Sequence, residues 1–152
     1  MRLNTKKQLT ILLAQGEIND ADITSLPQLQ QASAVPEHTI RALDRGAKAV
    51  TFAHLHEIAR VLGLPSVAPL FGLEVVQPAW ALPERPISAV AEARNISLRE
   101  VARQTEIWPA TINRLDRGLL RAVNVDVLAK LVAFGVHIDD LVRYRPAAGE
   151  GV

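Results

Sequence analysis

The chain of 152 residues contains no cysteine, and aromatic residues make up only 4% of it. The lack of cysteine excludes disulfide bonds, a thiolate nucleophile and a cysteine-ligated zinc site. No apolar run approaches the roughly 18 to 20 residues that a membrane span needs, and the N-terminal stretch lacks the small-residue cleavage site of a signal peptide. The sequence therefore predicts a cytoplasmic protein that makes no use of a membrane.

The chain also has little net charge, because 17 basic residues face 16 acidic ones and leave a formal charge of +1. This balance argues neither for nor against a nucleic-acid partner, so the distribution of charge matters more. Five arginines lie between Arg99 and Arg121, against three acidic residues. With 49% hydrophobic residues, the chain is long enough for one ordinary domain or two small ones.

The sequence repeats itself at one constant offset. The octapeptide TIRALDRG at residues 39–46 recurs as TINRLDRG at residues 111–118, with six of eight positions identical. The same offset relates Ser25-Leu26 to Ser97-Leu98 and Gly63 to Gly135. A register that holds over so long a stretch indicates a tandem duplication.

The repeat divides the chain into an N-terminal domain at residues 1–73, a linker at 74–86, a C-terminal domain at 87–145 and a tail at 146–152. The linker reads EVVQPAWALPERP, and its three prolines exclude a continuous helix. Its apolar residues, Trp80 among them, predict that it packs on one or both domains.

Each copy has the pattern of several short helices, and no strand-like alternation competes with this interpretation. Capping boxes at Ser25 and Ser97 open two equivalent helices, and Thr5 with Gln8 forms another candidate box. Helices at about 36–43 and 109–115 follow a short break, each with a proline in its first turn. The sequence thus predicts an all-α protein with four buried side chains in these helices: Ile40, Leu43, Ile112 and Leu115.

Two short helices joined by a turn of three or four residues form a helix-turn-helix. The stretch SLREVARQTEIWPATINRLDRG, with its continuation LAKLVAFGV and IDDLV, strongly resembles the lambda-repressor-like (Cro/Xre-type) DNA-binding family. The first copy, SLPQLQQASAVPEHTIRALDRG followed by LHEIARVLGL, resembles a second member. The resemblance covers most of the chain and implies two tandem helix-turn-helix domains. Where the family usually has a turn glycine, this chain has Ala34 and Glu106.

The resemblance implies a bacterial or phage transcription regulator that binds double-stranded DNA sequence-specifically, with the helices at about 36–43 and 109–115 in the major groove. Arginine can bond guanine and asparagine adenine through two hydrogen bonds each. The base-contacting residues that it implies are Glu37, His38, Arg41, Ala110, Thr111, Asn113 and Arg114. Contacts to the DNA backbone, which carry no sequence information, are implied for Arg45, Lys48, Arg117 and Arg121. For each of these residues the alternative is an ordinary solvated position on a helix or loop.

Other residues in the two helix pairs are predicted to be structural. Asp44 and Asp116 are expected to hold the following loops by local hydrogen bonds. Gly46 and Gly118 are expected to end the helices with a positive φ. Trp108 is expected to pack, with a sugar-phosphate contact as the alternative.

The chain offers no constellation for catalysis: it has no glycine-rich phosphate loop, no paired carboxylates and no triad spacing. His54 and His56 are two residues apart, so on a helix they point in different directions and do not favour a shared metal ion. His137 with Asp139 and Asp140 fits the start of a helix, where acidic residues are favourable. We therefore expect no enzyme, no cofactor and no metal site.

The predicted partners are double-stranded DNA and either a second copy of the chain, as a homodimer, or another regulator protein. Almost no sequence is left over for a ligand-sensing domain, so regulation is expected through abundance, a protein partner or self-association. Ordinary family members place two recognition helices about 34 Å apart, so a chain with two such helices is expected to read two unlike half-sites. The alternative function is a protein-interaction module, similar to an antiactivator, in which one or both helix-turn-helix surfaces bind protein.

Overall fold

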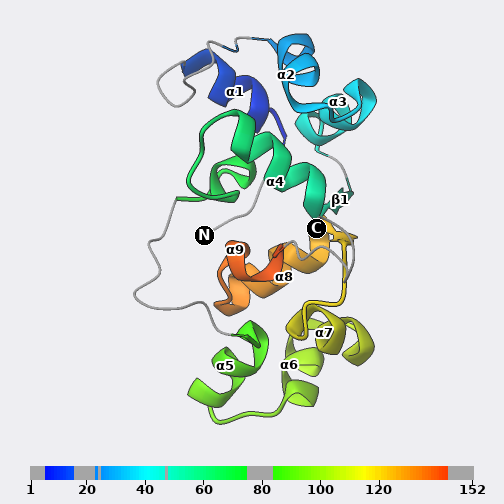
Figure 1. Cartoon of the computed structure of the whole chain (residues 1–152). Coiled ribbons are helices and arrows are strands. Elements are labelled where there is room, and N and C mark those ends of the chain that lie inside the picture. Colours follow the sequence, from blue (N-terminus) through cyan, green and yellow to red (C-terminus); the bar gives the residue numbers. More distant parts are fainter. Residues whose placement is uncertain (1–5, 16–22, 24, 47, 75–83, 144–152) are drawn as a thin grey trace.

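The computed structural model describes residues 6–15, 23, 25–46, 48–74 and 84–143 of the chain. In this part the chain is mostly helical and contains a small two-stranded sheet. Figure 1 shows two groups of helices, with α1, α2 and α3 at one end of the molecule and α5, α6 and α7 at the other. Across the described ranges, every helix is too short or too polar to span a bilayer.

The N-terminal half begins its helices with local signals that the sequence carries. The hydroxyl of Ser25 accepts a hydrogen bond from the backbone N–H of Gln28 (3.3 Å) and so caps the second helix, which ends at Ala34 with a φ of 60°. The elements of this half are α1 (Gln8–Gln15), α2 (Leu26–Ser33), α3 (Glu37–Asp44), β1 (Ala49–Thr51), α4 (Phe52–Val61) and the 3-10 helix η1 (Ala68–Phe71).

The C-terminal half repeats this order of helices and strand. The hydroxyl of Ser97 accepts from the backbone N–H of Glu100 (3.1 Å), and Glu106 ends that helix with a φ of 58°. The elements are α5 (Pro86–Ala93), α6 (Leu98–Thr105), α7 (Pro109–Asp116), β2 (Ala122–Asn124), α8 (Val125–Phe134) and α9 (Ile138–Leu141). The helix start expected at His137 is present, with Asp139 and Asp140 in the first turn of α9.

Equivalent elements in the two halves have equal lengths but not one constant spacing. The helices α6 and α7 follow α2 and α3 at the offset that the sequence repeat has, and the four helices are equally long. The strand β2 and the helix α8 begin one position later than this offset, so the loop after α7 is one residue longer than the loop after α3. Gly46 and Gly118, just beyond α3 and α7, have φ values of 93° and 70°, which confirms the predicted helix ends.

The two halves meet in the sheet. The strands β1 and β2 pair antiparallel, with Val50 opposite Val123 at the centre. The backbone N–H of Phe52 donates to the carbonyl of Arg121 (2.8 Å), and the N–H of Val125 donates to the carbonyl of Lys48 (2.7 Å). These two bonds join equivalent positions on either side of the Val50–Val123 pair, so the junction is locally symmetric.

Further bonds between the halves have no counterpart by this symmetry. Nε2 of His56 on α4 lies 2.5 Å from the carbonyl oxygen of Val142. The carboxylate of Asp139 on α9 accepts a hydrogen bond from the backbone N–H of Val67 (3.1 Å). Figure 1 accordingly shows α4 next to α8 and α9 in the middle of the molecule. The sheet and these bonds together join the halves into one unit.

The core confirms the burial that the helical spacing predicts. Ile40, Leu43, Ile112 and Leu115 are all at most 4% exposed. Their side chains anchor α3 and α7 against the remaining helices of each half. The polar faces of the two helices are therefore held at the surface by an apolar face below.

The sheet corrects the all-α prediction. Each strand has only three residues, which is too short for an alternating pattern to be read from the sequence. The strands belong to different copies of the repeat, so no hairpin signal marks them either. Three further expectations lie outside the described residues: the cap at Thr5, the packing of Trp80, and most of the linker (residues 75–83).

Candidate nucleic-acid interface

The helix pair α6–α7 is shaped by its turn. Glu106 adopts the left-handed conformation that the family's usual glycine accepts without strain. The side-chain hydroxyl of Thr105, the last residue of α6, donates to the carbonyl of Val101 (2.7 Å) and is buried. Pro109 then opens α7. Because the turn is tight, α7 crosses α6 and presents its outer face to solvent.

The C-terminal end of α7 is tied to α5 by a buried carboxylate. One oxygen of Asp116 accepts from the backbone N–H of Ser88 (2.8 Å), and the other accepts from the Ser88 hydroxyl. Asp44 makes the same pair of bonds to Thr10 in α1, at 2.9 and 2.7 Å. Thr10 and Ser88 are in the first turns of their helices, where backbone N–H groups lack helical partners. The predicted local loop contacts of both aspartates are therefore wrong, because the carboxylates turn inward to another helix.

The outer face of α7 carries most of the residues predicted to meet bases. Ala110, Asn113 and Arg114 are exposed, whereas Thr111 is half-buried. Among the described residues, no carboxylate forms an ion pair with Arg114. Arg117, directly after the helix, is exposed and equally without an ion pair in that part of the chain. This face is thus both basic and rich in hydrogen-bond donors.

On the neighbouring helix α6, an exposed arginine is paired with a glutamate of the same helix. Arg103 and Glu100 form an ion pair in which Nε of Arg103 lies 2.8 Å from Oε2 of Glu100. The hydrogen bonds from Arg103 and from Gln104 lower the pKa of Glu100 to about 2. Arg103 is therefore engaged within its own helix, in contrast to Arg114 on α7.

The exposed face of α3, the equivalent helix in the N-terminal half, carries different residues from that of α7. Glu37, His38 and Arg41 are exposed, as predicted for base-facing positions. Nε and Nη2 of Arg41 donate to Oε1 of Glu37 at 2.9 and 2.7 Å, and both side chains are about half exposed. The spacing of four residues is the signal from which this pair could have been predicted. The cation at the centre of α3 is thus partly neutralised on its own helix.

The residues predicted to contact the DNA backbone surround the sheet. Arg45 and Lys48 lie between α3 and β1, and Arg121 lies directly before β2; all three are exposed. The carbonyls of Lys48 and Arg121 accept the two symmetric bonds that flank the sheet. The sheet therefore places cationic side chains from both halves near one junction.

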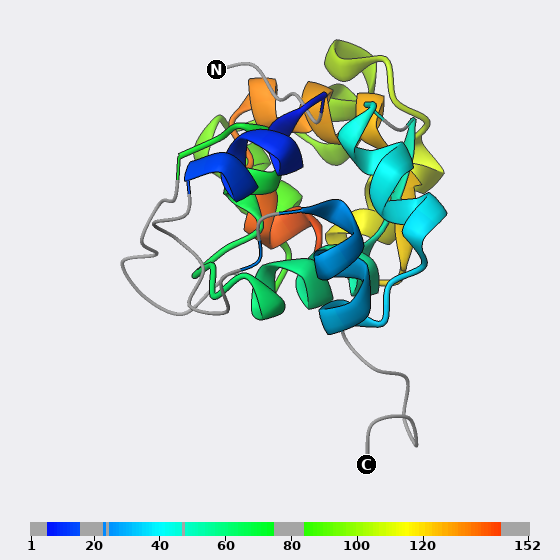
Figure 2. The same cartoon turned by 90° about the horizontal axis from the view of Figure 1, so that it is seen from above.

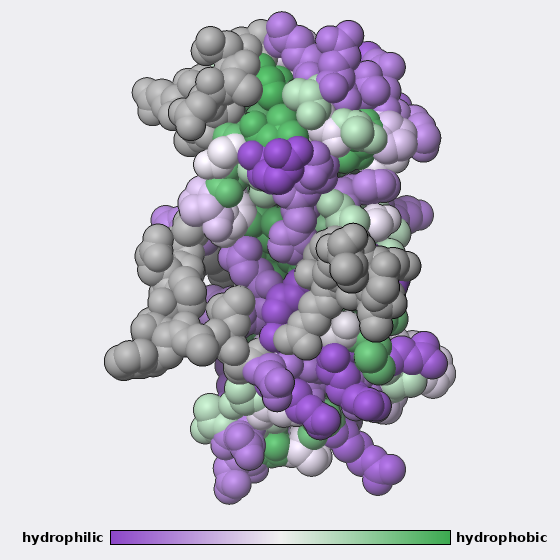
Figure 3. All heavy atoms as spheres, viewed as in Figure 1, coloured by the Kyte–Doolittle hydropathy of each residue, from purple (hydrophilic) through white to green (hydrophobic). Residues whose placement is uncertain are grey.

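The helices α3 and α7 lie toward the same side of the molecule (Figure 1). In Figure 1, α3 and α7 both lie on the side that carries β1. In Figure 2, seen from above, α3 and the yellow segment that leads into β2 also share one edge of the molecule. Figure 3 shows largely hydrophilic residues over the end that carries α2 and α3. The two helices are therefore on one side of the molecule, at opposite ends of it (Figure 1).

The side chain of Trp108 lies in solvent. This residue immediately precedes α7 and is 81% exposed, so the prediction that it packs is wrong. Leu119, shortly after α7, is exposed as well. The exposure of Trp108 could have been predicted from Pro109, because this proline starts α7 and leaves the side chain of Trp108 outside the helix.

These features define a helical protein with a helix-turn-helix unit that exposes a basic second helix. The family model of the Cro/C1-type HTH DNA-binding domain matches residues 87–147, so the chain contains one domain of this family, built from α5 to α9. The comparisons with curated proteins and with solved structures found no match. A domain of this type suggests DNA binding in the regulation of transcription.

Proposed function

We propose that this protein is a transcription regulator that binds double-stranded DNA sequence-specifically through two helix-turn-helix units in one chain. The observation that carries the proposal is the outer face of α7, which lies inside the matched domain and exposes Asn113 and Arg114. An amide and a guanidinium on one helix can each make two hydrogen bonds to a base edge in the major groove.

In the C-terminal unit we assign the base contacts to α7. Arg114 is the guanine reader, because its guanidinium has no ion pair among the described residues and can meet O6 and N7 together. Asn113 is the adenine reader through N6 and N7. Ala110 and Thr111 lie at the start of the helix, where short side chains suit close approach and contact with a thymine methyl group.

In the N-terminal unit we assign the base contacts to α3, through Glu37, His38 and Arg41. The support for a second unit is the shared plan: a left-handed turn residue, two buried apolar anchors and an aspartate bonded to the first helix. Glu37 can accept from a cytosine amino group while its carboxylate orients Arg41 toward the neighbouring base. The two units should therefore prefer different sequences.

Arg45, Lys48, Arg117 and Arg121 contact phosphates in this proposal. Their attraction is independent of sequence and depends on the release of counterions, so it weakens as salt is added. Because the sheet joins the two halves directly, one chain would present two recognition helices without a second copy. The preferred DNA site is then two unlike half-sites rather than a palindrome.

A protein-interaction module is the second candidate, and the Glu37–Arg41 pair is the observation that favours it. A helix whose central cation is paired with its own glutamate attracts phosphate weakly. In this alternative, α3 binds a protein partner while α7 retains the DNA contact or also binds protein.

Fluorescence anisotropy with a labelled random duplex tests the proposal on the full chain. We expect binding whose affinity falls steeply between about 50 and 200 mM salt. Selection from a pool of random duplexes should then recover two unlike half-sites, with Arg114→Ala erasing one and Arg41→Ala the other. Arg60→Ala, an exposed arginine of α4 that is paired with Glu57, is the control and should change neither. If no duplex binds at low salt, the regulator proposal is wrong and the interaction module stands.

A further inference from the structure

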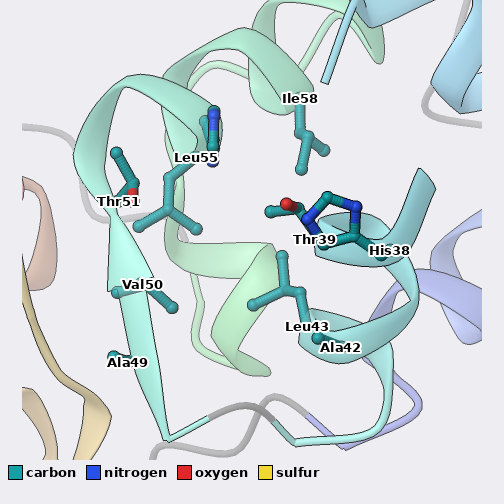
Figure 4. A pocket seen from close by; sticks show the side chains of 10 residues that line it. His38, Thr39, Ala42, Leu43, Ala49, Val50, Thr51, Leu55 and Ile58 are labelled. Carbon is teal, nitrogen blue, oxygen red and sulfur yellow. The ribbon is translucent and has the colours of Figure 1, made fainter. Parts of the chain in front are cut away.

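A cavity of about 270 Å³ lies between α3, β1 and α4 in the N-terminal half. Its walls are mainly apolar: Leu43 from α3, Val50 from β1, and Leu55 and Ile58 from α4. Figure 4 shows these side chains projecting from three elements toward the same space. The volume lies just below the range of about 300–1,000 Å³ that is usual for small-molecule sites, so it suits a compact molecule with one ring or a short branched chain.

Among the described residues, the polar side chains that line the cavity are the two imidazoles of His38 and His54 and the two hydroxyls of Thr39 and Thr51. His54 lines it, and the Nδ1 atom of this imidazole is buried without a hydrogen-bond partner in the described part of the chain. A buried polar atom without a partner costs free energy, so it favours a ligand that supplies one. His38 on α3 also lines the cavity, and Figure 4 shows its ring beside Thr39. No aspartate, glutamate, lysine or arginine is among the described residues that line it.

The fold does not require a histidine at the position of His38 or at that of His54. The residue of α7 that is equivalent to His38 is Ala110, and the residue of α8 that is equivalent to His54 is Val127. The C-terminal half therefore builds the same helices and strand with small or apolar residues at both positions. Packing alone does not explain why the N-terminal half has two imidazoles there.

We propose that this cavity binds a small monocarboxylate with an aromatic or branched aliphatic body. The apolar walls would surround the body, and His54 Nδ1–H would donate to a carboxylate oxygen. A carboxylate fits better than an amine, because the described lining contains no acidic side chain to pair with a cation. A site of this kind inside the helix-turn-helix unit would sense a ligand without a separate sensing domain.

One consequence rests on the proposed function. Because α3 forms a wall of the cavity and His38 is also exposed on it, a bound carboxylate would add negative charge beside the DNA-facing surface. Phosphate repels such a charge, so the ligand should weaken DNA binding by α3. The carboxylate would then act as an inducer.

Titration of the full chain with sodium benzoate, followed by NMR of the histidine side-chain nitrogens, tests the site. We expect saturable shifts of the His54 signals. His54→Leu should weaken benzoate binding by about ten- to hundredfold, the loss that fits one hydrogen bond to a charged group. Ala42→Leu, which lengthens another lining side chain into the cavity, should weaken it as well. His137→Leu, the same change at an exposed histidine, is the matched control and should leave binding unchanged.

The outcomes separate the site from the DNA function. Absence of saturable shifts, or equal binding by the folded His54→Leu variant, would overturn the site. Equal binding of benzyl alcohol, which has the same ring and no carboxylate, would overturn the assignment of ligand class. If benzoate binds the free chain but does not lower affinity for selected DNA, the site stands and its inducer role is wrong. If no DNA binds at all, the proposed function fails while the benzoate titration still decides the site.

Discussion

The helix pairs α2–α3 and α6–α7 share a backbone plan and differ in the surface that this plan presents. Both have a serine cap, a left-handed turn residue and an inward aspartate at the end of the second helix. On the exposed face, α3 carries an internal ion pair between Glu37 and Arg41, whereas α7 carries Asn113 and an arginine without such a partner among the described residues. Packing therefore constrains the inner positions of the two helix pairs, whereas their outer positions differ.

The largest loss of stability is expected in the core, where the two halves have the same buried leucine in the second helix of each pair. Leu115→Ala and Leu43→Ala should each lower the free energy of unfolding by about 2–5 kcal/mol, because each leaves a cavity under the second helix of its pair. Chemical denaturation of the full chain measures both. Leu119→Ala removes an exposed leucine and should change stability by less than about 0.5 kcal/mol. A large cost in only one half would show that the two helices are not anchored alike.

The aspartate anchors should give the next largest effect. Asp116→Ala removes an acceptor for two donors of Ser88, and Asp44→Ala does the same for Thr10, so each should cost about 1.5–3 kcal/mol. Thermal unfolding of both variants, beside Glu92→Ala at an exposed position of α5, makes the measurement. Costs no larger than that of Glu92→Ala would mean that these buried bonds do not hold the helices.

Arg114 and Arg117 are assigned different kinds of DNA contact, to a base and to a phosphate, so their substitutions should have different effects. Arg114→Ala should lose about 1–3 kcal/mol of binding to the selected site and little on random duplex. Arg117→Ala should weaken both DNAs alike and reduce the slope of affinity against salt by about one. Anisotropy titrations at several salt concentrations compare them. Identical behaviour of the two variants on both DNAs would contradict the assigned division of roles.

The turn residues offer a smaller and opposite effect. Glu106→Gly and Ala34→Gly should each raise stability by about 0.5–1 kcal/mol, because the strain that a side chain meets at positive φ outweighs the extra freedom that glycine loses on folding. Gln104→Gly, within the exposed part of α6, should instead lower stability by about the same amount. Urea denaturation of the three variants compares them. Destabilisation by glycine at either turn would show that the side chain there contributes more than its backbone strain costs.

The smallest effect concerns the ion pair that distinguishes α3. Glu37→Gln should cost about 0.3–0.5 kcal/mol of stability, as exposed pairs four residues apart do. It should strengthen binding to random duplex by releasing Arg41 for phosphate, and weaken binding to the selected site by removing the acceptor for a cytosine amino group. Glu100→Gln breaks the comparable pair on α6 and should change DNA binding less, because α6 is not one of the helices proposed to enter the major groove. Denaturation and anisotropy titrations measure the two effects. Unchanged binding of Glu37→Gln to the selected site would contradict the proposed contact from Glu37 to a base.

Much of the candidate site was predictable because its signals are local. Serine caps, prolines in first turns and apolar spacing each act within one helix, and they place α2, α3, α6 and α7 where the structure has them. The same spacing separates buried from exposed positions, so the predicted DNA-facing residues are all exposed or half-buried. The pair between Glu37 and Arg41 was also within reach of the sequence.

Local sequence signals thus define the two helix pairs, their buried faces and the residues on their outer faces. Tertiary packing decided the features that join residues far apart in the sequence: the pairing of β1 with β2, the bonds of Asp44 and Asp116 to other helices, and the cavity around His54. It also decided that Trp108 faces solvent, against its apolar character. The signals that start and end a helix act over a few residues of sequence. These contacts instead join residues far apart in the sequence, so they depend on how separate segments pack.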